Sequence, residues 1–202
     1  MLSPTDPINH ALFYKQRFKS FNFTMYNTIS KQGDCFIWPE TEGKRGSCEI
    51  ASCLYLYFKS TPAVVNHILY FSDRYRGQKL NKFVAAMCLI AVQLLPHLET
   101  TDLKCMVVGP NEMERDSMHS AISTEHKIIG KVNWSANWMT IARCDRKKGD
   151  KPSTVDEITN KQIIDWKSHQ KCHMTFRKAD VHGQSINWLY FSKKTQFVIN
   201  CK

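Results

Sequence analysis

The sequence predicts a mixed α/β (α+β) fold, and three observations support this prediction. Short runs of β-branched and aromatic residues alternate with longer segments whose apolar residues recur at helical spacing. Residues 68–96, ILYFSDRYRGQKLNKFVAAMCLIAVQLLP, pass from an apolar strand through a basic corner into a helix that is apolar on nearly every side. Such a helix belongs beneath other elements, against a sheet. A chain of 202 residues with 43% hydrophobic content can bury a sizeable core.

The individual elements are predicted from apolar spacing and from the turn residues between them. Strands are expected at residues 34–38, 47–58, 66–71 and 103–108, followed by a hairpin of 128–134 and 138–143. Helices are expected within residues 8–32, at 79–95 and at 112–123. The order up to residue 143 is therefore α, β, β, β, α, β, α, β, β.

The segment CDRKKGDKP, residues 144–152, is the best candidate for a linker because it is charged and almost free of apolar residues. It separates a core of residues 1–143 from a C-terminal region of residues 153–202 that is expected to pack on the core. Thr154 and Glu157 have the spacing of a capping box, which predicts a helix from there to about residue 168. Three strands are expected after it, near residues 172–177, 185–191 and 195–200.

The net charge of +10 favours anionic partners, such as nucleic acid, a nucleotide-like cofactor or an anionic surface. The N-terminus does not resemble a signal peptide, and the longest apolar run, residues 83–92, is too short to span a bilayer. The eight cysteines include no CxxC pair, which favours free thiols in a cytoplasmic protein. A zinc site of Cys48, Cys53, Cys172 and His173 fits no familiar spacing, so no metal is expected.

The corner in residues 75–81, YRGQKLN, resembles the R-G-x-G-x-G/A corner of the GNAT acyltransferase superfamily. The similarity covers about residues 10–143, because the order of predicted elements matches as well. Residues 107–123, VVGPNEMERDSMHSAIS, resemble the next strand and helix of the family, and residues 128–132, IIGKV, resemble the strand after them. The chain departs from the pattern at Lys79 and Asn81, where the family has small residues, and at Ile122, near which the family often has a tyrosine acid.

The resemblance implies that the chain binds acetyl-coenzyme A or another acyl-CoA. Backbone N–H groups at a helix N-terminus can hold a pyrophosphate, glycine permits close approach, and Arg76 and Lys79 add charge. In the family the pantetheine arm runs beside the preceding strand. The implied cofactor-binding residues are Leu69, Tyr70, Phe71, Arg76, Gly77, Gln78, Lys79, Asn81 and Asn111.

Acyl transfer to an amine needs a group that accepts the proton of the amine. The candidates are Glu49 on the strand at 47–58, His67 at the start of the strand at 66–71, and Asp73 just past its end. Each also has an ordinary structural interpretation, as a solvated strand residue, a hydrogen-bonded histidine at a strand edge and a turn or capping aspartate. The expected mechanism is direct attack of the amine on the thioester in a ternary complex.

The leading hypothesis is therefore an acyl-CoA-dependent N-acyltransferase whose amine acceptor is nucleic acid or something bound to it. The alternative is a non-catalytic nucleic-acid-binding or inhibitor protein on a GNAT-like scaffold that has lost its chemistry. Basic residues of the C-terminal region are the candidate phosphate contacts in both cases, and these are Lys171, Arg177 and Lys178.

Overall fold

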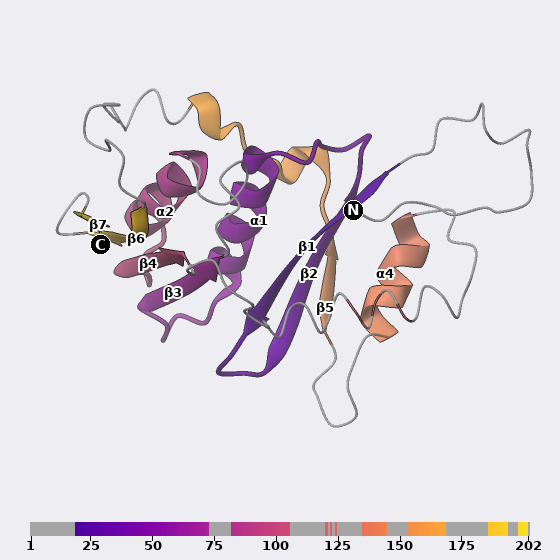
Figure 1. Cartoon of the computed structure of the whole chain (residues 1–202), viewed down its shortest axis with the longest axis horizontal. Helices are drawn as coiled ribbons and strands as arrows, with labels where there is room; N and C mark the ends of the chain where they lie inside the picture. Colours follow the sequence, from indigo (N-terminus) through magenta and orange to yellow (C-terminus); the bar gives the residue numbers. More distant parts are fainter. Residues whose placement is uncertain are drawn as a thin grey trace, which may run out of the picture. The chain divides into compact units, whose positions relative to one another are not determined.

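The fold is mixed α/β, as predicted, in a computed structural model of the whole chain (Figure 1). The structure describes residues 19–72, 82–105, 120, 122, 124, 135–144, 153–168, 186–193 and 198–201. The chain divides into two compact units, each with its own sheet. Unit 1 comprises residues 1–45 and 111–162, and unit 2 comprises residues 46–110 and 163–202.

Unit 1 is built on the hairpin of β1 (Ser20–Asn27) and β2 (Gln32–Pro39). The Asn27 side chain accepts hydrogen bonds from the backbone N–H groups of Ile29 and Ser30 at 3.0 Å each, which closes the turn. Lys31 takes a φ of 52° there. The predicted helix is wrong across residues 20–27, because the apolar residues of β1 alternate along a sheet instead of following helical spacing.

The third strand of this sheet comes from far along the chain. β5 (Thr154–Glu157) pairs in parallel with β2, in the register Asp34↔Thr154 to Ile37↔Glu157. The predicted helix starting at Thr154 is therefore wrong over these residues, and a single 3₁₀ turn, η2 (Asn160–Gln162), follows β5. Thr154 and Glu157 have the spacing of a capping box, but these residues form backbone hydrogen bonds to β2 instead. Pairing with a distant strand cannot be predicted from local spacing.

The helix α4 (Ser135–Cys144) packs against β2 and β5. A strand predicted at 138–143 is therefore a helix, and Ile141 and Ala142 lie buried with Cys35 and Ile37. Ile122, in a helical position, belongs to the same cluster. The residue that stands where the GNAT pattern has a tyrosine thus has a packing role in unit 1.

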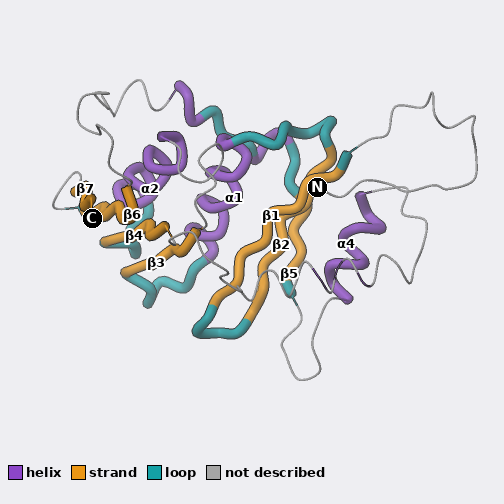
Figure 2. The backbone as a smooth tube through the Cα atoms, viewed as in Figure 1, coloured by secondary structure: helices purple, strands orange, loops and turns teal. Residues whose placement is uncertain are grey.

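Unit 2 holds a four-stranded sheet in the order β3-β4-β6-β7. β3 (His67–Ser72) and β4 (Thr100–Cys105) are parallel, whereas β6 (Ile186–Ser192) and β7 (Val198–Cys201) continue the sheet antiparallel. The helix α2 (Lys82–Leu94) packs on β4 and β6, and α1 (Ser47–Ser60) packs on α2 (Figure 2). The predicted strands at 66–71, 185–191 and 195–200 and the helix at 79–95 are confirmed in their type, with shifted ends, and β4 begins three residues before the predicted 103.

The largest correction is α1, because residues 47–58 were expected to form a strand. Their many β-formers suggested that interpretation, yet the buried Ile50, Leu54 and Phe58 recur every four residues, which is a helical spacing. The order helix, three strands, helix predicted for this part of the chain is replaced by β1, β2, α1, β3 and α2.

Residues 163–168 are fixed to α1 by one buried serine. Ser52 donates its hydroxyl to the carbonyl of Cys48 (2.8 Å) and accepts from Ile164 N–H (2.9 Å) and from the Trp166 indole N–H (3.0 Å). Trp166 is buried, and its ring meets Tyr55 edge-on at a centroid distance of 5.6 Å. Residues 153–202 therefore contribute to both units, with β5 in unit 1 and β6, β7 and Trp166 in unit 2. The predicted linker at 144–152 lies outside the described residues except for Cys144, the last residue of α4.

Candidate functional site

The candidate site lies where β3 and β4 begin, at one end of their parallel pairing. β3 has the sequence HILYFS, in which β-branched and aromatic residues favour a strand. The Asn66 carbonyl accepts hydrogen bonds from the backbone N–H groups of Glu99 (2.8 Å) and Thr100 (3.1 Å), which aligns the two strand starts. The first pair of the ladder is His67↔Thr100.

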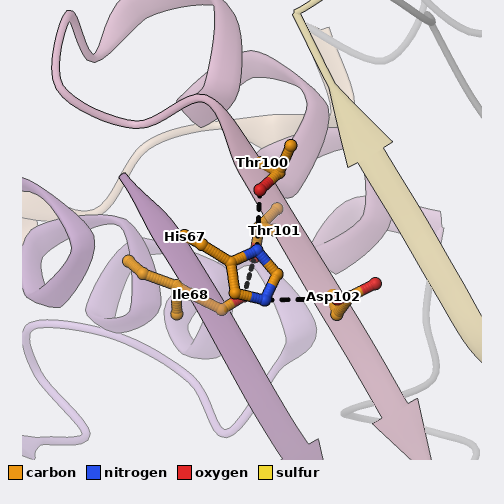
Figure 3. Close-up of polar contacts among 5 residues, drawn as sticks. All are labelled: His67, Ile68, Thr100, Thr101 and Asp102. Atoms are coloured by element: carbon orange, nitrogen blue, oxygen red, sulfur yellow. Dashed lines mark hydrogen bonds and ion pairs between the residues drawn. The ribbon is translucent and has the colours of Figure 1, made fainter. Parts of the chain in front are cut away.

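Three polar side chains converge at this end of the ladder (Figure 3). His67 Nδ1 lies 2.6 Å from Thr100 Oγ1, and His67 Nε2 lies 3.4 Å from Asp102 Oδ2. The imidazole is 44% exposed, whereas the Asp102 side chain is only 11% exposed. A buried carboxylate, an imidazole and a hydroxyl therefore lie in series, with the imidazole between the other two.

The proton positions follow from this contact pattern. When Thr100 donates its O–H to Nδ1, the neutral ring carries its proton on Nε2, which faces the carboxylate. Each ring nitrogen then has a protein partner, so an outside group reaches Nδ1 by displacing the Thr100 hydroxyl. A carboxylate behind an imidazole fixes the tautomer and stabilises the imidazolium that forms when the ring accepts a proton.

The neighbouring threonine, Thr101, has a structural role instead. Thr101 is fully buried, and its hydroxyl donates to the Ile68 carbonyl at 3.0 Å (Figure 3). It ties β3 to β4 on the opposite face of the sheet, where Leu103 and Phe191 are also buried. Alternation along the strands thus separates a packed face from the face that carries His67.

The face of His67 is open along β3. Leu69 is 41% exposed and Phe71 is 48% exposed, so alternate residues of the strand lead from the histidine toward Ser72. This exposed row, His67, Leu69 and Phe71, is called the β3 row below. Of the predicted cofactor-binding residues, Leu69 and Phe71 belong to it, whereas Tyr70 lies on the other face and is half-buried.

The other predicted site residues lie apart from this row or outside the described residues. Glu49 is in the first turn of α1, not on a strand, and its carboxylate lies against Gly46, where an added Cβ would come within 2.5 Å of Oε2. A carboxylate there stabilises the helix N-terminus. The predicted positions outside the described residues are Asp73, Arg76, Gly77, Gln78, Lys79, Asn81, Asn111, Lys171, Arg177 and Lys178.

Thr100 and Asp102, which give His67 its partners, were not among the residues predicted from the sequence. Both precede the expected strand, which was predicted to begin at residue 103. No alternation in the sequence could have marked them, because Thr100, Thr101 and Asp102 are all polar and only Leu103 is apolar.

The thiols in the described part of the chain do not extend this site. Cys35, Cys48, Cys53 and Cys88 are not in disulfides, as predicted, and burial raises the pKa of Cys88 to about 12 and that of Cys53 further. Burial also raises the pKa of the Cys48 thiol. Such thiols are poor nucleophiles at neutral pH. Within the described residues, no group of three potential ligands could hold a metal ion, and no helix has the length and apolarity to cross a membrane.

Comparison with known proteins returned no match, whether against family profiles, curated proteins or solved structures.

Proposed function

We propose that unit 2 transfers an acyl group from acyl-CoA to an amine, with His67 as the proton acceptor. The observation that carries this proposal is the β3 row. It begins at the His67 imidazole, which lies beside the Asp102 carboxylate, and its exposed side chains continue to the end of β3. The basic corner of residues 73–81 follows directly in the sequence, before α2 begins at Lys82. Ligands of parallel β-α-β units bind beyond the carboxyl ends of the strands, and the corner occupies that position in the chain.

The length of β3 suits an extended ligand. At a rise of about 3.3 Å per residue, roughly 17 Å separate His67 from Ser72. A pyrophosphate held by Arg76, Gly77 and Lys79 would direct a pantetheine arm back along the β3 row, over Leu69 and Phe71. The thioester would then lie near His67.

This arrangement differs from the one that the GNAT resemblance implies. β3 and β4 pair over all six residues, from His67↔Thr100 to Ser72↔Cys105, whereas the family has a splayed pair beside the cofactor. The helix α1 also stands where the resemblance implies a strand. In our proposal the arm therefore lies across the face of β3 rather than between two strands.

The experiment is a thermal melt with acetyl-CoA, followed by an assay of acetyl transfer to amines. A ligand at 100 times its Kd stabilises the native state by about 2.7 kcal/mol. We expect this shift in the wild-type chain, its reduction in Arg76→Ala and Gly77→Asp, and its retention in Lys59→Ala, which removes an exposed cation of α1. His67→Gln should keep the shift and lose the transfer. No shift at millimolar acetyl-CoA would reject the proposal.

Nucleic-acid binding is the second candidate, and the charge distribution favours it. Unit 2 holds 13 Lys and Arg against six Asp and Glu, a net +7, whereas unit 1 holds 15 against 12, a net +3. Cationic surfaces bind phosphates with a strong salt dependence. The bound nucleic acid would be, or would carry, the amine acceptor of the enzyme. In a non-catalytic protein, nucleic-acid binding would be the whole function.

The test is the salt dependence of binding to duplex DNA. The combined Lys171→Ala, Arg177→Ala, Lys178→Ala variant should lower the slope of log K against log salt by up to about three. The matched control removes three exposed cations of unit 1, Lys19, Lys31 and Lys161, and should leave the slope unchanged. Equal slopes in all three proteins would remove these C-terminal residues from the interface.

A further inference from the structure

We infer that Thr100 is an acyl-accepting nucleophile, activated by His67 and Asp102. The hydroxyl lies 2.6 Å from His67 Nδ1, within hydrogen-bond reach of a base, and the base is backed by Asp102 at 3.4 Å. A nucleophile touching a base that a third group orients is the arrangement that activates hydroxyl nucleophiles. The inference rests on the proposed function only for its natural acyl donor, since the hydroxyl chemistry does not require coenzyme A.

The pairing of β3 with β4 places the three side chains next to one another. Thr100 is the ladder partner of His67, and Asp102 follows two residues later on the same face. The Asn66 carbonyl anchors the Thr100 N–H at 3.1 Å. A site built on paired strands keeps its groups near a productive geometry before any substrate arrives.

The contacts of His67 also decide which hydroxyl or amine reacts first. Because Nε2 faces Asp102 and Nδ1 faces Thr100, the group in position to give up a proton to the ring is the Thr100 hydroxyl. An amine would have to displace it. A two-step route through Thr100 thus uses the resting contacts as they stand, in contrast to direct attack in a ternary complex.

The reaction has an acylation step and a deacylation step. Thr100 Oγ1 attacks the carbonyl carbon of an acyl thioester or activated ester, and its proton moves to His67 Nδ1. The C–S or C–O bond to the leaving group breaks, and His67 returns the proton to the departing thiolate or alkoxide. Water or an amine then attacks the Thr100 ester, gives a proton to His67, and releases a carboxylic acid or an amide as Oγ1 recovers its proton.

A second threonine–histidine pair in unit 2 provides an internal control. Thr61 Oγ1 lies 3.1 Å from His97 Nε2, but the Thr61 hydroxyl also lies 2.6 Å from the Phe58 carbonyl, to which it donates. Among the described residues, His97 has no carboxylate at ion-pair distance, whereas His67 has Asp102. The Thr61 proton is therefore engaged elsewhere, and this pair lacks the third group.

The test uses the full chain and p-nitrophenyl acetate. We expect a burst of p-nitrophenolate, with an acetyl group on the peptide that contains Thr100 and none on the peptide that contains Thr61. Thr100→Ser should keep the burst. Thr100→Val, which preserves shape and strand preference, should abolish the burst, and His67→Gln should slow it about 100-fold or more. Asp102→Asn should slow it to a smaller extent, and Thr61→Val should leave it unchanged.

Several outcomes separate this inference from the proposed function. A burst that survives in Thr100→Val, or acetylation confined to lysines, overturns the inference even when acetyl-CoA raises the melting temperature. Acetylation of Thr100 by the ester without any shift from acetyl-CoA supports the inference and rejects the proposed cofactor. Equal melting temperatures of the wild type and Thr100→Val show that lost reactivity does not come from lost folding.

Discussion

The two units use a strand of similar composition in opposite ways. In unit 1, four consecutive residues of β2, from Cys35 to Trp38, are buried, so both faces of that strand are covered. In unit 2, β3 is apolar too, yet the alternate residues of the β3 row are exposed. A strand covered on both faces contributes its side chains to stability, whereas a strand open on one face can present them to a ligand. This difference places the candidate chemistry in unit 2.

The same C-terminal region completes both sheets. β5 pairs with β2 in unit 1, while β6 and β7 extend the sheet of unit 2 and Trp166 is fixed to α1. Substitutions that act on one sheet at a time can therefore show whether the two units differ in stability as their burial suggests.

Trp166→Ala should have the largest effect. It removes a buried aromatic side chain and leaves the Ser52 hydroxyl without the indole donor, so we expect a loss of about 3–5 kcal/mol. Native-state hydrogen exchange should show faster exchange for amides of α1, β3 and β4 and little change for β1 and β2. Equal acceleration in both sheets would mean that the two units unfold as one.

Ser52→Ala should come next, at about 1–3 kcal/mol, because the part-buried Ile164 N–H and the buried Trp166 indole N–H lose their shared acceptor. Ser60→Ala is the matched control on the same helix, since the Ser60 hydroxyl donates to the Tyr57 carbonyl at an exposed position. Urea unfolding compares the two free energies. Similar losses in both variants would argue against the role of Ser52 in holding residues 163–168.

Phe71→Ala should cost only about 1 kcal/mol, because roughly half of the ring is already exposed. Phe36→Ala, the unit 1 counterpart, should cost several times more, since Phe36 is 4% exposed. Chemical denaturation of the two variants measures the contrast directly. A large loss in Phe71→Ala would show that the β3 row is a packing surface rather than a ligand surface.

The smallest effect, and the one with opposite sign, is expected at Asp34 in unit 1. Burial raises the pKa of this carboxyl above its ordinary value of 3.8, the Thr154 hydrogen bond opposes the rise and the Asp156 charge adds to it. The folded chain therefore holds a proton that the unfolded chain releases, so stability declines as the pH rises from about 3.8 through the raised pKa. Asp34→Asn should raise the melting temperature at pH 7, and this gain should vanish at pH 3. A loss at pH 7 would show that the ionised Asp34 is favourable in the fold.

Much of unit 2 could be predicted from the sequence, because its signals are local. The apolar run of α2 is longer than a typical strand, which indicates a buried helix. The apolar residues of β3 lie between turn residues, which indicates a strand. His67 could be chosen as a candidate base because it begins that strand. In α1, by contrast, the aromatic residues and Ile50 suggested a strand, although the four-residue spacing of Ile50, Leu54 and Phe58 was present.

Only the tertiary structure decided which residues accompany His67 and which strands complete the sheets. The sequence from Thr154 predicted a helix, but it forms β5 because it pairs with the edge of β2, about 120 residues earlier in the chain. Thr100 and Asp102 reach His67 because β3 and β4 are parallel and in one register, across a helix and 33 residues of chain. Local sequence fixes which side chains are available on each strand. Register, which depends on hydrogen bonds between distant segments, decides which of them meet.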